Sequence, residues 1–550
     1  MLPADAPRER ATPPVYEGTF EPMPGQTVRH GRVQWAKPHE RGTRVARAAN
    51  APATRGAAAT RARASSSGLA PYAPSADAPW DRRRALHLLR RTGFGATRPA
   101  VDAVLALSPR AAVDAIVDGA AALGPLARPD WVDVPPPHWT APAAERQAYS
   151  RATSQWANTF EWETYTRFMG EGATEPLARV AVAFRERMTL FWSGHFVTHW
   201  GTYFLAGWLW RYWSLLRTHA LGDFRQAVHD IGINPAMLVY LNGIDNRVWA
   251  PNENYARELL ELFTMGITAP DGSANYTEAD IQELSRVLTG WGADYYGDLE
   301  AHFIPDWHDG NPKTVFGQTA NWSYDDVVPL LFGARGPEIA HFICRKLYRH
   351  FVYAVPDEAV VAEMAALFQA EDWQIAPVVK ALLNSAHFHE REVIGTRIKS
   401  PVENNFGFHT ALGRTPDPER RGFIWWTMWL AGQVVFEPPT VAGWPGYREW
   451  VDTGTLAMRW LVSEWYANGD EDLRAYALTL PGAYDAAALV TELSELMLGQ
   501  PLSPEAHAQA VDILLNGIPA YEWDPNRSGA VWRIRALAQH LGRLPEHLLV

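Results

Sequence analysis

NENYARELLELFTMG, residues 252–266, is the stretch around which the rest of the chain is arranged. Its apolar residues are Ala256, Leu259, Leu260 and Phe263. Their i, i+3, i+4, i+7 spacing is that of an amphipathic helix with one buried stripe. Pro251 precedes the stretch, and Gly266 closes it in the manner of a left-handed helix cap. The sequence therefore predicts a helix of about four turns in a mainly α fold.

The polar residues of this stretch face two environments. Glu253, Arg257 and Glu261 form an i, i+4, i+8 row beside the apolar stripe, whereas Glu258 points nearly opposite to it. In one interpretation the row is a surface ladder of ion pairs, each contributing a few tenths of a kcal/mol. In the other it is one wall of a polar site, where Glu253 meets a buried histidine and Glu258 has a different partner.

The second informative segment is PLARVAVAFRERMTLFWSGHFVTHW, residues 176–200. Its apolar stripe carries His195 along the middle, so this histidine is expected to be buried. His199 follows at i+4, a spacing that lets two imidazoles reach one metal ion. The chain has no HExxH motif, however, and the helix can end at Gly194. A core histidine hydrogen-bonded to a carboxylate is the alternative to a metal ligand.

Two loops carry further candidate residues. Between Gly292 and Ser323 the sequence predicts a short irregular or β-containing insertion. The candidate acid–base groups in it are His308, Asp309 and Lys313. Glycine and proline turns present such side chains from fixed positions, and a solvated turn is the alternative. The second loop, PPTVAGWPG at 438–446, is suited to closing over a cleft or to anchoring the chain end. The first role makes Trp444 a candidate substrate-binding residue.

Composition excludes several classes of protein. The formal net charge of −11 argues against general nucleic-acid binding, which depends on clustered Lys and Arg. Cys344 is the single cysteine, which rules out an intrachain disulfide, and its apolar surroundings favour a buried, inert thiol. No run of about 18 apolar residues exists, so no membrane span is expected. The 25 tryptophans indicate broad aromatic packing or a stacking-lined cleft.

The chain divides into two parts by composition. Residues 1–79 are rich in Pro, Ala, Arg and Ser without a sustained period, which predicts a disordered extension. Residues 80–550 are expected to form one large helical domain that contains the β insertion. The first residues, MLPADAPRERATPP, hold no hydrophobic signal core, so the chain as written points to a soluble, cytoplasmic protein and leaves the compartment open.

From about Trp80 to its end, the chain resembles a bacterial family called domain of unknown function 1800. The motifs that carry the resemblance are RRTGFGAT (90–97), FW-x-x-HF (191–196), NENYARELLELFTMG (252–266), YTEADIQELSRVLTGW (276–291), HDGNPKT (308–314), CRKLYRHFV (344–352), IKSPVE (398–403) and PPTVAGWPG (438–446). The resemblance implies a mostly helical single domain and a bacterial source, without implying an activity. It also implies frequent export and a protein partner, encoded nearby, that resembles phosphatases and sulfatases.

The chain departs from the family at one place. Where relatives commonly have FWHNHF, this chain has Ser193 and Gly194 before His195. A metal site built from paired histidines at 193 and 195 is thereby in doubt, and His199 is the imidazole that would replace the missing one.

Two functions of different classes follow. The first is an enzyme with a cleft lined by His195, Glu253, Glu258, Glu261, His308, Asp309 and Lys313. In it a divalent metal held by His195, His199 and Glu253 is the candidate cofactor, acid–base chemistry without a metal is the alternative, and Arg257 and Trp444 bind substrate. The second is a non-catalytic binding or assembly protein that meets a partner through Trp-rich surfaces near Trp131 and Trp444. The sequence selects no substrate.

Overall fold

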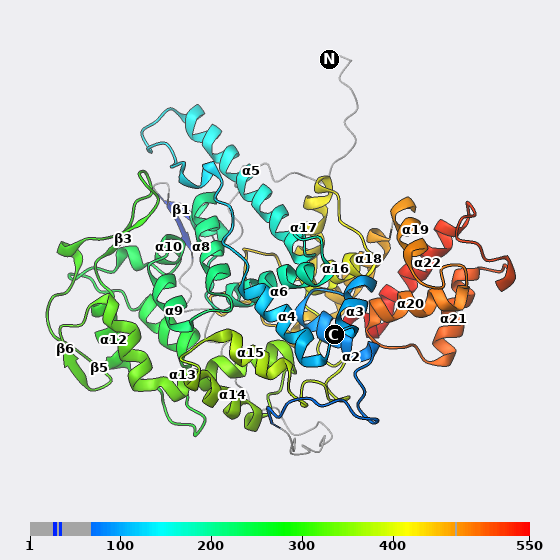
Figure 1. The fold of residues 1–550 in the computed structure, drawn as a ribbon. Coiled ribbons are helices and arrows are strands. Elements are labelled where there is room, and N and C mark those ends of the chain that lie inside the picture. Colours follow the sequence, from blue (N-terminus) through cyan, green and yellow to red (C-terminus); the bar gives the residue numbers. More distant parts are fainter. Residues whose placement is uncertain (1–25, 30–31, 36–67, 468–469) are drawn as a thin grey trace, which may run out of the picture. The chain divides into compact units, whose positions relative to one another are not determined.

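The computed structural model describes residues 26–29, 32–35, 68–467 and 470–550 (Figure 1). The chain falls into two compact units, Met1–Ser66 and Ser67–Val550. In the first unit β1 (Gln26–Arg29) and β2 (Arg32–Trp35) form an antiparallel pair. The disordered extension predicted for residues 1–79 falls mainly on residues outside those described.

Ordered chain precedes Trp80, where the sequence placed the start of the helical domain. The backbone amide of Tyr72 donates to the backbone carbonyl of Asn384 at 2.7 Å. The backbone amide of Ala386 donates to the backbone carbonyl of Ala70 at 2.8 Å. The ring of Tyr72 lies 4.4 Å from the ring of His389. Because these hydrogen bonds join backbone groups, the composition of the segment gives no sign of them.

The second unit is mainly α-helical, as the sequence predicts (Figure 1). The helices of its first half are α2 (Arg82–Thr92), α3 (Arg98–Leu105), α4 (Pro109–Ala121), α5 (Ala143–Phe168), α6 (Pro176–Ser193), α7 (Trp200–Tyr203), α8 (Ala206–His219), α9 (Phe224–Gly232), α10 (Pro235–Tyr240), α11 (Asn254–Glu258) and α12 (Glu278–Val287). Those of the second half are α13 (Val327–Phe351), α14 (Glu358–Ala370), α15 (Ile375–Leu383), α16 (Pro401–Ala411), α17 (Arg421–Leu430), α18 (Thr453–Tyr466), α19 (Asp470–Thr479), α20 (Ala486–Leu498), α21 (Pro504–Leu515) and α22 (Ala530–Arg543). Short 3₁₀ turns are η1 (Asp130–Asp133), η2 (Gly243–Asp245), η4 (Pro305–Trp307), η5 (Tyr324–Asp326), η6 (Pro418–Arg420), η7 (Tyr447–Trp450), η8 (Ala520–Glu522) and η9 (Pro545–Leu548).

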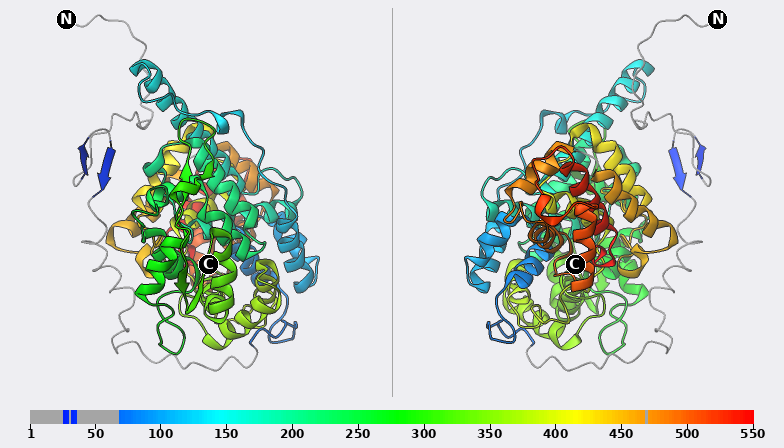
Figure 2. Two further views of the ribbon diagram at one scale, coloured as in Figure 1. Left: turned by 90° about the vertical axis from the view of Figure 1, so that its left-hand side faces the viewer. Right: turned by 90° about the vertical axis from the view of Figure 1, so that its right-hand side faces the viewer.

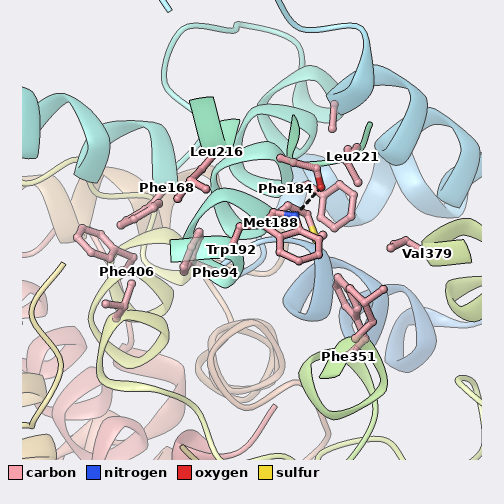
Figure 3. Packing of buried hydrophobic residues seen from close by; sticks show 14 of the residues in the cluster. Phe94, Phe168, Phe184, Met188, Trp192, Leu216, Leu221, Phe351, Val379 and Phe406 are labelled. Carbon is pink, nitrogen blue, oxygen red and sulfur yellow. Dashed lines mark hydrogen bonds between the residues drawn. The ribbon is translucent and has the colours of Figure 1, made fainter. Parts of the chain in front are cut away.

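Helix α6 lies inside this unit, in contact with α2, α3, α4, α5 and α8. Figure 3 shows the aromatic and aliphatic side chains around it, with Phe184, Met188 and Trp192 projecting from α6 itself. All three are buried. Of the predicted apolar stripe, Val180, Phe184 and Met188 are buried, whereas Leu177 and Phe191 at its two ends are partly buried. The indole of Trp192 donates to the carbonyl of Ala220 at 2.9 Å, so its polar group is satisfied. Burying each such side chain stabilises the fold by about 2 kcal/mol.

The β insertion is confirmed. It contains the antiparallel pairs β3 (Trp291–Ala293) with β4 (Ala301–Phe303) and β5 (Lys313–Val315) with β6 (Gln318–Ala320). Within the second unit these strands and α12 lie on the opposite side from the C-terminal helices α20, α21 and α22 (Figure 2). The insertion rests on α12, whose N-terminus has the capping box of Thr277 and Asp280.

The stretch 252–266 is helical, but its second half is a π-helix. Helix α11 continues directly into the π-helix η3 (Leu259–Thr264). The hydroxyl of Thr264 donates to the carbonyl of Leu259 at 2.6 Å, which anchors the widened turn. The predicted apolar stripe is buried, and Gly266 ends the helix with φ of +75°. π-Turns are rare, and those that occur are frequently at functional sites. The residues around this π-turn are therefore candidates for a functional site.

Two further predictions concern the single cysteine and the membrane-spanning potential of the helices. Cys344 is buried in α13, and burial raises the pKa of its thiol, so the expected inert environment is present. Within the described ranges, no helix has both the length and the apolar character needed to cross a bilayer.

Candidate functional site

The π-helix offers two of its backbone carbonyls to side chains of neighbouring helices. His195, just after α6, is hydrogen-bonded through Nε2 to the carbonyl of Phe263 at 3.0 Å. Lys346 of α13 donates from Nζ to the carbonyl of Leu262 at 3.0 Å and contacts His195 Nδ1 at 2.9 Å. A carbonyl oxygen only accepts, so Nε2 carries the proton and Nδ1 accepts from the amine. The buried histidine is confirmed, and its partners are a lysine and a backbone carbonyl.

Burial sets the charge state of the Lys346–His195 pair. Burial, and then the charge of Arg349, lower the pKa of the Lys346 amine to about 7. Burial and the neighbouring ammonium hold the pKa of His195 well below its usual range, so the imidazole stays neutral. The ammonium also lies 4.5 Å from the centre of the Phe342 ring. No third hydrogen-bond acceptor for Nζ occurs among the described residues.

The loop with Trp444 packs on the residue that precedes His195. A Cβ atom built on Gly194 would lie 3.4 Å from a ring carbon of Trp444, and one built on Gly443 would lie 2.3 Å from the carbonyl oxygen of Gly194. The departure from the family pattern at 194 is therefore where this loop docks. Gly443 has φ of +83°, a conformation that favours glycine. Trp444 itself is half-buried by this packing.

The three residues expected to bind a metal do not converge. Both ring nitrogens of His195 are engaged, as described above. His199 Nδ1 accepts the amide of Gly201 at 2.9 Å and caps α7, and Glu253 pairs with Arg257. In the described part of the chain, one group of three acidic or histidine side chains lies close enough together to hold a metal ion. Its members are the exposed residues Asp294, Asp298 and His302. The donor set predicted from the sequence therefore does not fit a shared ion in this geometry.

Arg257 belongs to an ion-pair ladder on the surface. It pairs with Glu253 at 3.0 Å and with Glu278 of α12 at 2.6 Å. The side chains of Arg257 and Glu253 retain 33% and 38% of their exposure, so the pair contributes about 0.5 kcal/mol. Glu261, which the sequence placed next in the row, lies instead 3.5 Å from the hydroxyl of Tyr276.

Glu258 is separate from this ladder. It is half-buried, and burial together with the charge of Glu261 raises the pKa of its carboxyl to about 7. Its charge in turn acts on Tyr240. No hydrogen-bond partner for Glu258 occurs in the part of the chain that the structure describes, so no hydrogen bond joins it there to the loop of His308. Glu258 is therefore a titrating group near neutral pH on the same helix as the π-turn.

The side chains of the HDGNPKT loop bind the loop to its supports. His308 Nδ1 is hydrogen-bonded to the carbonyl of Thr289 at 3.0 Å, and Asp309 accepts from Arg286 Nε at 2.7 Å. Against the effect of burial, Arg286 and Asn311 lower the pKa of Asp309 to about 2. Lys313 is buried, and its ammonium donates to the carbonyl of Trp322 at 2.9 Å. The Asp309–Arg286 pair attaches the insertion to α12, His308 binds the residues just after α12, and the Lys313 contact lies within the insertion. None of these contacts joins the loop to His195.

Sequence reasoning did not single out Lys346. It lies in CRKLYRHFV, where Leu347 and, just before the motif, Ile343 lie on the buried side of the helix. A lysine next to two buried aliphatic positions at i−3 and i+1 is the signal that was available. Its partners come from segments about 80 and 150 residues away, so no local pattern identifies them.

Arg187 and Glu403 form a second unpredicted centre. Both are buried, and the guanidinium of Arg187 donates to the carboxylate of Glu403 and, at 2.7 Å, to the carbonyl of Gly93. Arg397 donates to the same carboxylate at 3.0 Å. Through Arg187 these contacts join the RRTGFGAT and IKSPVE motifs, and they account for the buried carboxylate of IKSPVE.

An open hollow of about 610 Å³ lies between α9 and the start of α13. Its lining residues are Asp223, Arg225, Gln226, His229, Asp325, Val328, Pro329, Phe332, Gly333 and Trp373. His229 is hydrogen-bonded to Asp230 at 3.0 Å and to Asp325 at 3.2 Å, and the bond to Asp230 raises its pKa although burial opposes the change. The residues predicted from the sequence do not line this hollow.

Comparison with known proteins gives one match. The model of the family described as protein of unknown function (DUF1800) matches residues 87–547. No curated protein and no solved structure matches the chain.

Proposed function

We propose that this chain, which belongs to the DUF1800 family, is an acid–base enzyme whose reacting group is the amine of Lys346. The observation that carries the proposal is the arrangement of Nζ, which is bound to His195 Nδ1 at 2.9 Å and to the carbonyl of Leu262 at 3.0 Å. An amine with a pKa of about 7 is divided between its neutral and charged forms at neutral pH. Such a group transfers protons in both directions most effectively.

The two hydrogen bonds give each partner a defined role. In the neutral amine the two N–H groups point to His195 and to Leu262, and the lone pair occupies the remaining position. A substrate bond to hydrogen breaks, its proton moves to Nζ, and the electron pair stays on the substrate. The ammonium so formed keeps both acceptors. His195 remains neutral and acts as a positioning residue, because its own proton is held by Phe263.

Glu258 supplies a second group with a pKa of about 7 on the α11–η3 helix. A carboxyl and an amine that both titrate near neutral pH give the protein an acid and a base under the same conditions. The proposal assigns no metal, since both ring nitrogens of His195 are engaged, and it leaves Arg257, His308, Asp309 and Lys313 to the structural contacts described above. The helical unit Ser67–Val550 carries all the groups involved.

Competitive labelling with acetic anhydride tests the proposal, since the reagent modifies only neutral amines. Over about pH 5 to 11, the labelling of Lys346, followed by peptide mass spectrometry, is expected to rise with a midpoint near 7. Lys380 is the internal control, because Asp114 and Asp118 raise its pKa against the effect of burial. A midpoint for Lys346 as high as that of Lys380, or the absence of labelling at every pH, would refute the proposal.

A second candidate function is binding to a protein partner through tryptophans on α17 and α18. Trp426, Trp429 and Trp460 are 39%, 56% and 40% exposed. Trp131, by contrast, stacks on Trp156 with the ring planes 8° apart, and Trp444 packs on Gly194. We therefore propose α17 and α18, in place of Trp131 and Trp444, as the surface for the assembly function.

The partner in this second proposal is the neighbour-encoded protein that resembles phosphatases and sulfatases. Its co-purification with the chain is expected to be lost in Trp429→Ala. Trp532→Ala is the matched control, because Trp532 is 61% exposed on α22. Equal co-purification with both variants and with the parent chain would eliminate this surface.

A further inference from the structure

A buried cationic cluster lies where α2, α16 and α18 meet the segment before α16. Its members are Arg90, Arg91, Arg397, Lys399 and Arg459. The electrostatic effects of these groups overlap, since Arg90 and Arg397 both act on Arg91 and on Lys399. Helices α16 and α18 lie side by side (Figure 1). The cationic cluster shares no residue with the Lys346–His195 pair.

Glu403 is the carboxylate that forms ion pairs at this cluster, and it is already saturated. One carboxylate oxygen accepts from both Arg187 and Arg397, and the other accepts from Arg397 at 3.0 Å and from the amide of Ser400 at 2.7 Å. Among the described residues, Arg90, Arg91, Lys399 and Arg459 form no ion pair. The positive charge of the cluster therefore exceeds what Glu403 neutralises.

Several donors in the cluster have no acceptor. Arg91 and Arg459, which are 0% and 1% exposed, each have two guanidinium nitrogens without a partner: Nε and Nη1 of Arg91, and Nε and Nη2 of Arg459. Lys399 is 2% exposed, and its ammonium has no hydrogen-bond acceptor in the described ranges. Buried donors are nearly always paired, because each unpaired one loses its hydration without replacement. Unpaired donors on Arg91 and Arg459, next to a lysine whose ammonium has no acceptor among the described residues, call for an acceptor that carries negative charge.

Lys399 and Arg459 are held next to each other. Arg459 Nη1 donates to the backbone carbonyl of Lys399 at 2.9 Å, which leaves Nε and Nη2 free. A Cβ atom built on Gly407 of α16 would lie 3.8 Å from Lys399 Nζ, so the ammonium approaches a backbone without a side chain. Burial, followed by the charge of Arg90, lowers the pKa of Lys399 well below its usual range. A bound anion would reverse this effect.

We propose that the cationic cluster binds one inorganic oxyanion, phosphate or sulfate, through Lys399 Nζ and the free Nε and Nη2 groups of Arg459. A tetrahedral oxyanion offers several acceptor oxygens and up to two negative charges, which matches an ammonium and the fork of a guanidinium. Arg91 and Arg90 add further positive charge around it. Because the cluster is buried, the anion is a structural component acquired on folding and not a substrate that exchanges freely.

The first experiment measures the anion directly. The full chain, purified without phosphate or sulfate and desalted, is denatured, and the released ions are separated by ion chromatography. About one phosphate or one sulfate per chain is expected, and the chromatogram distinguishes the two. In parallel, refolding in either anion is expected to raise the melting temperature above that in chloride at equal ionic strength. Absence of both the released ion and the increase would overturn the proposal.

The variant Lys399→Met distinguishes a cluster that holds an anion from one that is empty. If the anion is bound, the variant releases less than about a tenth of an equivalent and loses the increase in melting temperature. If the cluster is empty, the variant removes a buried amine without an acceptor and is at least as stable as the parent chain, with no change in released ion. Lys380→Met, at a partly exposed lysine paired with Asp114, is the control and keeps both signals. An increase that persists in Lys399→Met would show binding elsewhere and would also overturn the proposal.

Discussion

Replacing Lys346 with methionine will reduce stability more at alkaline pH than at acidic pH. The amine has a pKa of about 7 in the folded chain and about 10.5 when unfolded. Between these values the unfolded chain binds more protons than the folded chain, so this lysine makes the folded state more stable as pH rises from about 7 to about 10.5. The methionine variant lacks that increase. The parent chain will therefore gain stability relative to the variant when the pH is raised through neutrality.

The magnitude follows from the pKa shift. At about pH 8.5 the solution is roughly 1.5 pH units above the pKa of Lys346 in the folded chain. At 1.36 kcal/mol per unit, the free energy of unfolding of the parent chain rises by about 2 kcal/mol between about pH 6 and about pH 8.5. Because Lys346 is only partly buried by surface area, solvent screening reduces this to about 1 kcal/mol. A constant loss of about 1 to 3 kcal/mol adds to it at every pH, since His195 Nδ1 loses its donor.

Melting temperatures from calorimetry measure the effect. For a unit of nearly five hundred residues, about 1 kcal/mol corresponds to about 1 °C. The difference between parent and variant is expected to widen by about 1 °C from pH 6 to pH 8.5. Lys380→Met is the control, because a lysine with a raised pKa stays charged in both states over this range. A difference that stays constant or narrows with pH would refute the assignment of a low pKa to Lys346.

Three other variants test separate parts of the structure. Glu258→Gln will raise the melting temperature above about pH 7 and have no effect below about pH 4.5, because the folded carboxyl holds its proton to a pKa of about 7; an equal effect at both pH values would contradict this. Gly443→Ala will lower the free energy of unfolding, measured with denaturant, by about 3 kcal/mol. Gly446→Ala, where an added Cβ meets nothing closer than 3.9 Å, will lower it by about 1 kcal/mol. Equal losses would show that the Trp444 loop does not dock as described. Arg187→Met will lower the free energy of unfolding by about 4 kcal/mol, since it leaves the buried carboxylate of Glu403 short of a donor. Arg257→Met on the exposed ladder will lower it by about 0.5 kcal/mol. Similar losses would show that the two arginines are in similar environments.

Local patterns in the sequence were enough to predict the elements of the fold. The spacing of Ala256, Leu259, Leu260 and Phe263 gave a helix with a buried stripe, and Gly266 gave its end. The π-turn could not be predicted in the same way. It depends on a bond from Thr264 to a carbonyl five residues earlier, and an α-helix through the same residues would bury the same stripe.

The candidate site was less predictable than the fold because its contacts join distant segments. The burial of His195 followed from its place in the apolar stripe of α6, but its partners lie on the π-helix and on α13. A carboxylate partner was inferred from Glu253, which is the nearest acid to the edge of the stripe. In the structure that acid pairs with Arg257 one helical turn away, because both side chains are on the surface.

The close approach of Gly443 to Gly194 has a consequence for the synthesis of the chain. About 250 residues separate the two glycines, and at roughly 5 to 20 residues per second the ribosome needs about 12 to 50 s to make them. Throughout that time the end of α6 is without the loop that covers it. The π-helix and α13 emerge earlier, so the bonds of His195 can form first. The Trp444 loop would then be added to an existing framework, as a late step of folding on the ribosome.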